Sequence, residues 1–202
     1  MIHQIENKTY EKYLLNQTNF DETLPTKYQK QAKFAIKDEY TFDFLELSEE
    51  HSEKELENSL MEKIRQFLVE MGGYFCFIGN QYRMKVENED FFIDLLLFHR
   101  KLNCLIAIEL KIGKFKPEYA GKMQFYLSVL NDKIKLANEN PSIGIIICKS
   151  KNRTIVEYAL KDTNKPIGVA TYNITDKLPK KLSKYLPSKQ DITDKLKTLN
   201  NS

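Results

Sequence analysis

Two strongly apolar segments joined by a short polar stretch constrain this chain more than any other feature. The first covers residues 91–98 and the second covers residues 104–112, and both are much shorter than the roughly 20 apolar residues of a membrane-spanning helix. Polar residues dominate the stretch 99–103 between them, as in a hairpin loop. The pattern predicts two neighbouring antiparallel strands.

Each apolar segment carries an acidic residue, Asp94 in the first and Glu109 in the second. If residues 100–103 form the loop, the antiparallel register places Asp94 opposite Glu109, with Cβ atoms about 5 Å apart. Lys111 shares that face because side chains alternate along a strand. Two carboxylates at this spacing repel by roughly 3 kcal/mol at an effective dielectric near 20. A cation between them is therefore expected.

Three ionisable groups within apolar strands need a chemical reason, because a buried charge costs several kcal/mol. Two hard oxygen ligands on one face suit Mg²⁺. Such an ion polarises a phosphodiester and lowers the pKa of a bound water. Lys111 would then orient that water or neutralise developing charge. The alternative is a purely structural cluster of salt bridges.

Length and composition fit one medium domain with an appendage. The 202 residues are 42% hydrophobic and 29% charged, as in a soluble globular protein. The N-terminus is polar and lacks the apolar region of a signal peptide, so a cytoplasmic protein without membrane contact is expected. The three cysteines lie far apart without metal-ligand spacing, which predicts buried thiols in a reducing compartment.

Charge is distributed unevenly along the chain. Residues 1–99 hold 11 Lys and Arg against 19 Asp and Glu, whereas residues 100–202 hold 20 against 9. A basic half that begins at the hairpin suggests a polyanionic partner. A merely solvated basic surface is the alternative, and net charge does not decide between them.

Hydrophobic periodicity predicts the remaining elements. Ser52 and Glu55 form a capping box at the start of a helix that ends at Gly72, and a second capping box is expected from Thr154 to Glu157. Helices are predicted at 26–37, 52–71, 117–138, 154–160 and 178–185, and strands at 74–78, 81–86, 91–98, 104–112, 143–148 and 167–172. The first two strand segments are either one bent strand or a bulged pair. This order predicts an α/β fold with a mixed sheet flanked by helices.

Other candidate residues lie outside the hairpin. Glu57 shares a helix face with buried positions, so it is either a third acid of the site or a surface glutamate. Gln124 lies one turn after a small-residue patch on the second long helix, and Gln81, Tyr82 and Arg83 could reach a phosphate. The alternative for each of these residues taken alone is an ordinary surface position, which the sequence favours. The sequence shows neither a Ser-His-Asp arrangement nor a glycine-rich phosphate loop, so nucleotide hydrolysis is disfavoured.

Three strings resemble one known family. They are FIDLL at residues 92–96, AIELKIGKFKPEYAGKMQ at residues 107–124, and KNRT at residues 151–154. With the acidic helix and the order of elements, they resemble the C-terminal nuclease domain of the bacterial YhcG-like family, within the PD-(D/E)XK superfamily. The resemblance covers roughly residues 24–187. The proline that names the superfamily is replaced by Ile93.

The resemblance implies a restriction-endonuclease-like αβββαβ core and hydrolysis of DNA by a metal-activated water. Mg²⁺ is the implied cofactor, with Mn²⁺ as an alternative. The implied metal ligands are Asp94, Glu109, the backbone carbonyl of Leu110 and Glu57, while Lys111 is the implied catalytic lysine. The implied position of Gln124 is also at the catalytic site. Basic residues assigned to DNA contact are Arg83, Lys114, Lys116, Lys122 and Arg153.

The expected organisation has three parts. Residues 1–50 are an N-terminal extension or helical arm, residues 51–187 the nuclease domain, and residues 188–202 a polar tail. Relatives usually carry an N-terminal helical domain that this chain is expected to lack. The expected function is a restriction-type or defence endonuclease. The alternatives are a structure-selective nuclease such as a junction resolvase, or a nuclease-like binding module. DNA is the expected partner, and a homodimer or a separate recognition domain or subunit remains open.

Overall fold

The two apolar segments form an antiparallel pair at the expected register. In the computed structural model, which describes residues 17–45, 47 and 51–174, β4 (Glu89–His99) pairs with β5 (Cys104–Lys114). His99 lies opposite Cys104, so four residues form the loop as predicted. The last paired residues are Leu95 and Ile108, one step before the two acidic residues.

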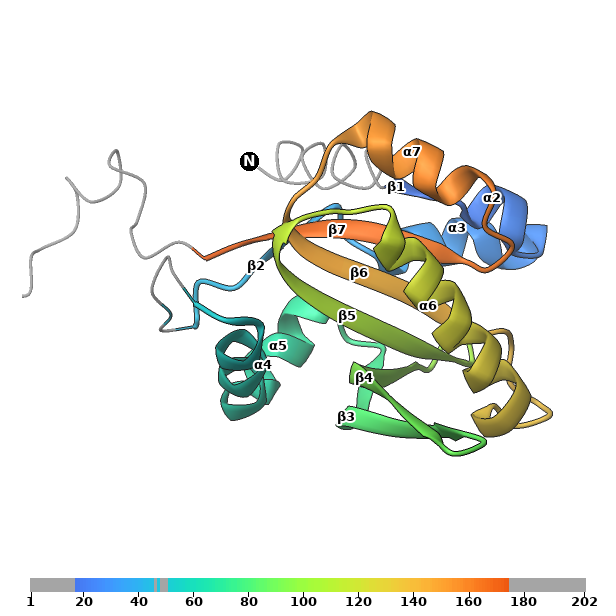
Figure 1. The fold of residues 1–202 in the computed structure, drawn as a ribbon, viewed down its shortest axis with the longest axis horizontal. Coiled ribbons are helices and arrows are strands. Elements are labelled where there is room, and N and C mark those ends of the chain that lie inside the picture. Colours follow the sequence, from blue (N-terminus) through green and yellow to red (C-terminus); the bar gives the residue numbers. More distant parts are fainter. Residues whose placement is uncertain (1–16, 46, 48–50, 175–202) are drawn as a thin grey trace, which may run out of the picture.

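Within the described residues, these strands belong to a seven-stranded mixed sheet with the order β1-β7-β6-β5-β4-β3, and β2 pairs with β7 beside β1 (Figure 1). Strands β3, β4 and β5 are antiparallel, whereas β5, β6 and β7 are parallel. The predicted α/β class and mixed sheet are therefore confirmed. The remaining strands are β1 (Gln17–Thr18), β2 (Glu39–Thr41), β3 (Phe75–Val86), β6 (Ile143–Ser150) and β7 (Ile167–Asn173).

Helices cover both faces of the sheet and bury two apolar cores. One core lies under α6, the short π-helix that extends it, and α7, while the other lies under α3, α4 and α5. The order α4/α5, β3, β4, β5, α6, β6 is the predicted αβββαβ succession. The helix bounds are α2 (Phe20–Thr23), α3 (Thr26–Ala35), α4 (Glu53–Glu62), α5 (Ile64–Met71), α6 (Glu118–Val129), η1 (Leu130–Ile134) and α7 (Arg153–Lys161).

Helix starts and breaks differ from the predictions in two places. The capping box of Ser52 and Glu55 is confirmed, but the helix that it opens breaks at Lys63 into α4 and α5. Helix α7 begins without the predicted capping box from Thr154, because the side chain of Asn152 accepts the hydrogen bond from the backbone N–H of Ile155. Among the described residues, no helix is long and apolar enough to cross a membrane.

The described part of the expected N-terminal extension is built into this same sheet. Strands β1 and β2 both pair with β7, and Phe20, Tyr40 and Phe42 are fully buried in the core that also contains Leu56. The region thus contributes strands and core side chains. The helix expected at 178–185 and the polar tail expected at 188–202 lie outside the described residues.

Helix α6 lies very close to β6, and one glycine permits this. A Cβ atom at Gly144 would lie 2.5 Å from Cγ of Met123 and 2.6 Å from its Sδ. These distances are well below ordinary van der Waals contact, so only glycine fits under Met123 at this position. The approach holds α6 over the sheet and directs Lys122, the residue before Met123, toward Glu109 on β5.

Candidate active site

The site is built where β4 and β5 separate. Beyond the last paired residues, Oδ2 of Asp94 accepts a hydrogen bond from the backbone N–H of Leu110 at 2.8 Å. The carboxylate thus takes the place of the backbone acceptor that a continued ladder would supply. Asp94 and Glu109 consequently lie at the end of the paired region.

Glu109 is a buried carboxylate in which one oxygen has partners and the other has none among the described residues. Its side chain is only 2% exposed. Its Oε2 lies 2.8 Å from Nζ of Lys122 and 3.7 Å from Nζ of Lys111, while Oε1 is buried without a hydrogen-bond partner among the described residues. Burial raises the pKa of Glu109, and the negative charge of Asp94 raises it further, against the lowering effect of the two lysines. In the described part of the chain, Oε1 is therefore a buried acceptor that makes no hydrogen bond.

Lys111 is held in place by groups on two elements. Its Nζ donates to Oε2 of Glu53 at 2.9 Å, at the start of α4, and to the backbone carbonyl of Leu110 at 3.0 Å. Burial lowers the pKa of this ammonium, but the hydrogen bond to Glu53 and the charges of Glu109 and Asp94 outweigh that effect and raise it. Glu53 was not identified from the sequence. Its place in the first turn after a capping box was the available signal.

Glu57 joins the site through a glutamine. Its side chain is buried and accepts hydrogen bonds from Nδ2 of Asn80 at 3.3 Å and from Nε2 of Gln81 at 2.7 Å. The same Nε2 lies 3.3 Å from Oδ1 of Asp94, so Gln81 bridges the two acids. Gln81 has φ of +43°, next to the irregularity in β3 between Phe77 and Gly79. This left-handed conformation is uncommon for a residue that is not glycine, and it marks a locally special backbone.

The carboxylates do not form a three-residue metal cluster within the described residues, but they offer the kind of oxygen ligand that Mg²⁺ uses. Among the described residues, no group of three or more His, Cys, Asp or Glu side chains is arranged to hold a metal ion, since Glu57 meets Asp94 only through Gln81. Mg²⁺, however, commonly uses one or two carboxylates and completes its shell with waters and phosphate oxygens. The unpartnered Oε1 of Glu109, beside the Asp94 charge, is an acceptor of that kind. The donor set therefore fits such an ion.

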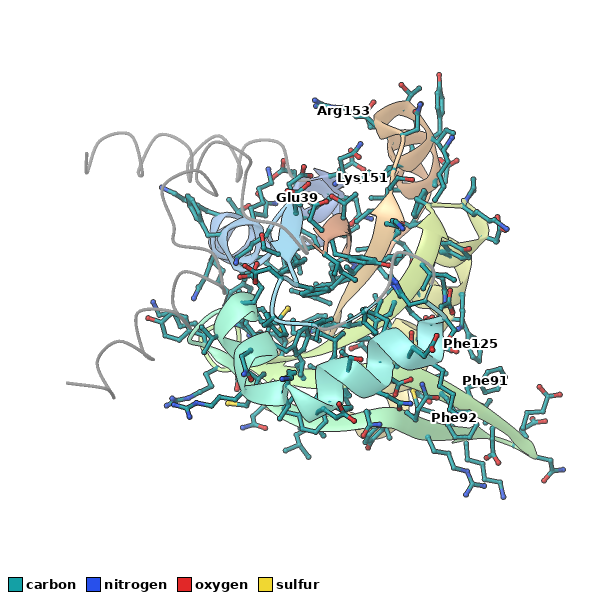
Figure 2. The ribbon with its side chains drawn as sticks, turned by 90° about the vertical axis from the view of Figure 1, so that its left-hand side faces the viewer. Glu39, Phe91, Phe92, Phe125, Lys151 and Arg153 are labelled. Atoms are coloured by element: carbon teal, nitrogen blue, oxygen red, sulfur yellow. The ribbon has the colours of Figure 1, made fainter. Side chains whose placement is uncertain are left out.

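Several predicted residues lie elsewhere or have other partners. Lys122 was assigned to DNA contact, but it pairs with Glu109 inside the site. Oε1 of Gln124 accepts a hydrogen bond from the backbone N–H of Asn164 at 3.1 Å, so the structure does not bring this side chain to the carboxylates. Figure 2 shows Arg153 at the start of α7, well away from α4, and its Nε pairs with Glu157 at 2.9 Å.

The other basic residues assigned to DNA lie at the surface. Arg83 pairs with Asp90 across the β3–β4 hairpin at 2.8 Å. Lys114 and Lys116 are exposed and follow the Glu109-Lys111 segment on the same stretch of chain. Lys116 forms a long ion pair of 4.0 Å with Glu118. Lys114 and Lys116 therefore present positive charge on the segment that follows the carboxylates, with Lys114 roughly 17 Å along β5 from Glu109.

Comparison with known proteins identifies the family. The model of the YhcG PDDEXK nuclease domain matches residues 33–187. The putative nuclease YhcG of Escherichia coli (strain K12) is 34% identical over 174 residues, which cover 85% of this chain and 46% of that protein. The chain thus spans about half the length of this curated relative.

Similar solved structures match part of the chain at low sequence identity. A repair endonuclease from Pyrococcus abyssi has a TM-score of 0.39 and 16% identity, over 62% of this chain and 47% of that one. EndoMS in complex with double-stranded DNA has a TM-score of 0.43 and 13% identity, over 68% of this chain and 50% of that one. The residues matched by the family model include Glu53, Asp94, Glu109 and Lys111. The chain therefore belongs to the family of YhcG PDDEXK nuclease domains.

Proposed function

We propose that this chain is a Mg²⁺-dependent nuclease that hydrolyses DNA phosphodiester bonds, with Mn²⁺ as an alternative ion and a role as a restriction-type or defence endonuclease. The observation that carries the proposal is the buried Oε1 of Glu109, which lacks a partner among the described residues although a second carboxylate, Asp94, lies beside it. An acceptor in this state costs free energy unless something binds it. Membership of a nuclease family supports the same interpretation.

Asp94 and Glu109 are the residues that would hold the ion. Glu57 supports Asp94 through Gln81. The carbonyl of Leu110 already accepts from Lys111, so it would have to serve two partners. When bound, the ion would supply a Lewis acid for the phosphate and lower the pKa of a water molecule that it binds.

The lysines supply positive charge where the reaction needs it. Lys111 is 11% exposed and fixed by Glu53, so its ammonium is positioned in advance to donate to a phosphate oxygen near Glu109. Lys122 lies on the other side of the same carboxylate and is the more exposed of the two, at 44%. Lys114 and Lys116 would contact the backbone of the bound strand outside the site.

The test is cleavage of supercoiled, linear, single-stranded and branched DNA by the purified chain with Mg²⁺, Mn²⁺ or EDTA. Glu109→Gln and Lys111→Met keep side-chain shape and are expected to reduce cleavage at least about a hundredfold, the scale of a lost catalytic group. Glu118→Gln removes an exposed acid on α6 and is the matched control, with no expected change.

Each result separates one interpretation from another. Full activity of Glu109→Gln or Lys111→Met would contradict the assignment of the site. Preference for branched DNA would assign a structure-selective nuclease such as a junction resolvase. Binding of DNA without divalent-dependent cleavage would assign a binding module in place of an enzyme.

A further inference from the structure

A basic basin lies at the far end of the hairpin strands from the carboxylates. It has a volume of about 470 Å³ and is formed by α3, the residue before β3, and the end of β4 with its loop. His99 lines the basin, five residues along β4 from Asp94. At about 3.3 Å per residue the two are roughly 17 Å apart, so the basin is separate from the candidate active site.

Positive charge collects in this basin. Its lining includes Lys27 and Lys30 from α3 and Lys101 from the β4–β5 loop, and none of the described Asp or Glu side chains contributes to it. Ammonium groups gathered around one depression repel each other and attract an anion. The basin therefore favours a ligand that carries phosphate or another negative group.

Aromatic rings hold two of these ammonium groups in place without neutralising them. Nζ of Lys101 lies 4.0 Å from the centroid of the Tyr74 ring, and Nζ of Lys27 lies 4.6 Å from that of Tyr28. The backbone N–H of Arg100 donates to the carbonyl of Tyr74 at 2.9 Å and ties the loop to this ring. A cation over a neutral ring has no opposite charge beside it, whereas a cation and a carboxylate form a pair of zero net charge. The positive charge stays available to a ligand.

The basin also offers flat apolar surface, and the buried ring of His99 contacts the ring of Tyr74 beside it. Phe34 and Tyr74 line it and are 43% and 45% exposed, which is high for aromatic side chains. Nδ1 of His99 accepts a hydrogen bond from the backbone N–H of Leu102 at 3.0 Å. The proton of the neutral ring is consequently on Nε2, which makes that atom a donor.

We propose that this basin binds one unpaired nucleotide of a nucleic-acid strand, through lysine contacts to its phosphate and aromatic contact to its base. Positive grooves with exposed aromatic side chains bind single strands in this way. A volume of about 470 Å³ lies in the range of small-molecule sites. Paired bases would not expose their faces to Phe34 or Tyr74, so a duplex fits the basin poorly.

The binding test uses a fluorescently labelled oligothymidylate of about twelve nucleotides, within the range of single-strand site sizes. Fluorescence anisotropy is measured in EDTA, so the result does not depend on cleavage or on the proposed nuclease activity. The double variant Lys30→Glu with Lys101→Glu is expected to bind at least about tenfold more weakly. Its slope of log K against log salt should be shallower by about 1.4, or about 0.7 for each phosphate that the variant no longer neutralises. Lys161→Glu, on α7, is the matched control and should bind as the unmodified chain does.

A second measurement reports on the basin directly. The chain contains no tryptophan, so Tyr74→Trp places a single indole there. Its emission should fall when the oligothymidylate binds. If thymidine monophosphate also quenches the emission, free nucleotides enter the basin as well. If only the oligothymidylate quenches it, the site is specific for polynucleotides. Either result supports the proposal. Unchanged oligothymidylate affinity in the double variant, an equal loss of duplex affinity, or indole emission that responds to none of these probes would overturn it.

Discussion

Replacement of Lys122 by methionine probes the electrostatic design of the candidate active site. Nζ of Lys122 lies 2.8 Å from the buried Glu109 carboxylate, and Nζ of Lys111 lies 3.7 Å from it. Methionine retains most of the side-chain length while removing the charge. The variant therefore isolates the effect of one ammonium group on one buried acid.

The expected loss of stability follows from burial. Removal of one partner of a fully buried ion pair costs about 3–5 kcal/mol, because the other charge remains buried. Lys122, however, is 44% exposed and Lys111 remains beside Glu109, so solvent screening and the second lysine reduce the loss. We expect the free energy of unfolding to fall by about 1–2 kcal/mol at neutral pH, in the lower part of the roughly 1–3 kcal/mol that an unpartnered buried group costs.

The loss should depend on pH in one direction. Burial already raises the pKa of Glu109 above the ordinary value of 4.5, and the loss of Lys122 would raise it further. A carboxyl whose pKa is higher in the folded than in the unfolded state destabilises the fold as pH rises through the unfolded pKa toward the folded one. The variant should therefore be less stable than the unmodified chain at neutral pH, and the difference should shrink toward zero as pH falls through the raised folded-state pKa of Glu109 toward 4.5.

Urea denaturation followed by circular dichroism, repeated between neutral and acidic pH, measures this difference. Lys116→Met removes an exposed ammonium with a 4.0 Å ion pair and should change stability by less than about 0.5 kcal/mol. Mg²⁺ should raise the unfolding midpoint of Lys122→Met more than that of the unmodified chain, since the ion would no longer compete with Lys122 for Glu109. A pH-independent loss, or equal stabilisation by Mg²⁺ in both proteins, would refute the reasoning.

Further predictions concern packing and thiol reactivity. Gly144→Ala should destabilise the fold by about 1–3 kcal/mol, because its Cβ would overlap the thioether above it. Gly121→Ala, in α6 with open space around the new methyl group, should stabilise the fold by up to about 1 kcal/mol. The urea midpoint should therefore fall in Gly144→Ala and rise in Gly121→Ala. The prediction of buried thiols is wrong for Cys76, which is exposed on β3, and holds for Cys104 and Cys148. In native protein Cys76 should therefore react with a thiol reagent. Cys104 and Cys148 should not, since burial raises their pKa to about 12 and about 11. Rapid reaction of all three cysteines in native protein would contradict this expectation. In denatured protein all three cysteines should react.

The sequence predicted the parts of the fold that local patterns determine. Alternating and continuous apolar runs located the strands, and the short loop specified the hairpin register that puts Asp94 and Glu109 at the same level. The succession of helices and strands along the chain also followed from these patterns, whereas the order of the strands within the sheet was not predicted. Break points within helices were missed, as at Lys63, because no proline or glycine marks that position.

Long-range side-chain partners could not be predicted, because they depend on how elements pack. The link of Glu57 to Asp94 through Gln81 requires a left-handed backbone conformation at Gln81 inside a strand. No sequence pattern predicted that conformation. The pairing of Lys122 with Glu109 depends on the close approach of α6 to β6. Strands β1 and β2 were missed for a simpler reason, since segments of two and three residues carry too little periodicity to identify.

The hydrogen bond from the backbone of Leu110 to Asp94 changes how variants of this chain should be interpreted. The Asp94 carboxylate satisfies that N–H, so an aspartate there serves folding even in a chain that has lost activity. Glu109 differs in this respect, because its buried Oε1 has no hydrogen-bond partner among the described residues and so destabilises the fold when nothing is bound to it. Among relatives of this chain, retention of the second acid is therefore the better indicator of an active enzyme.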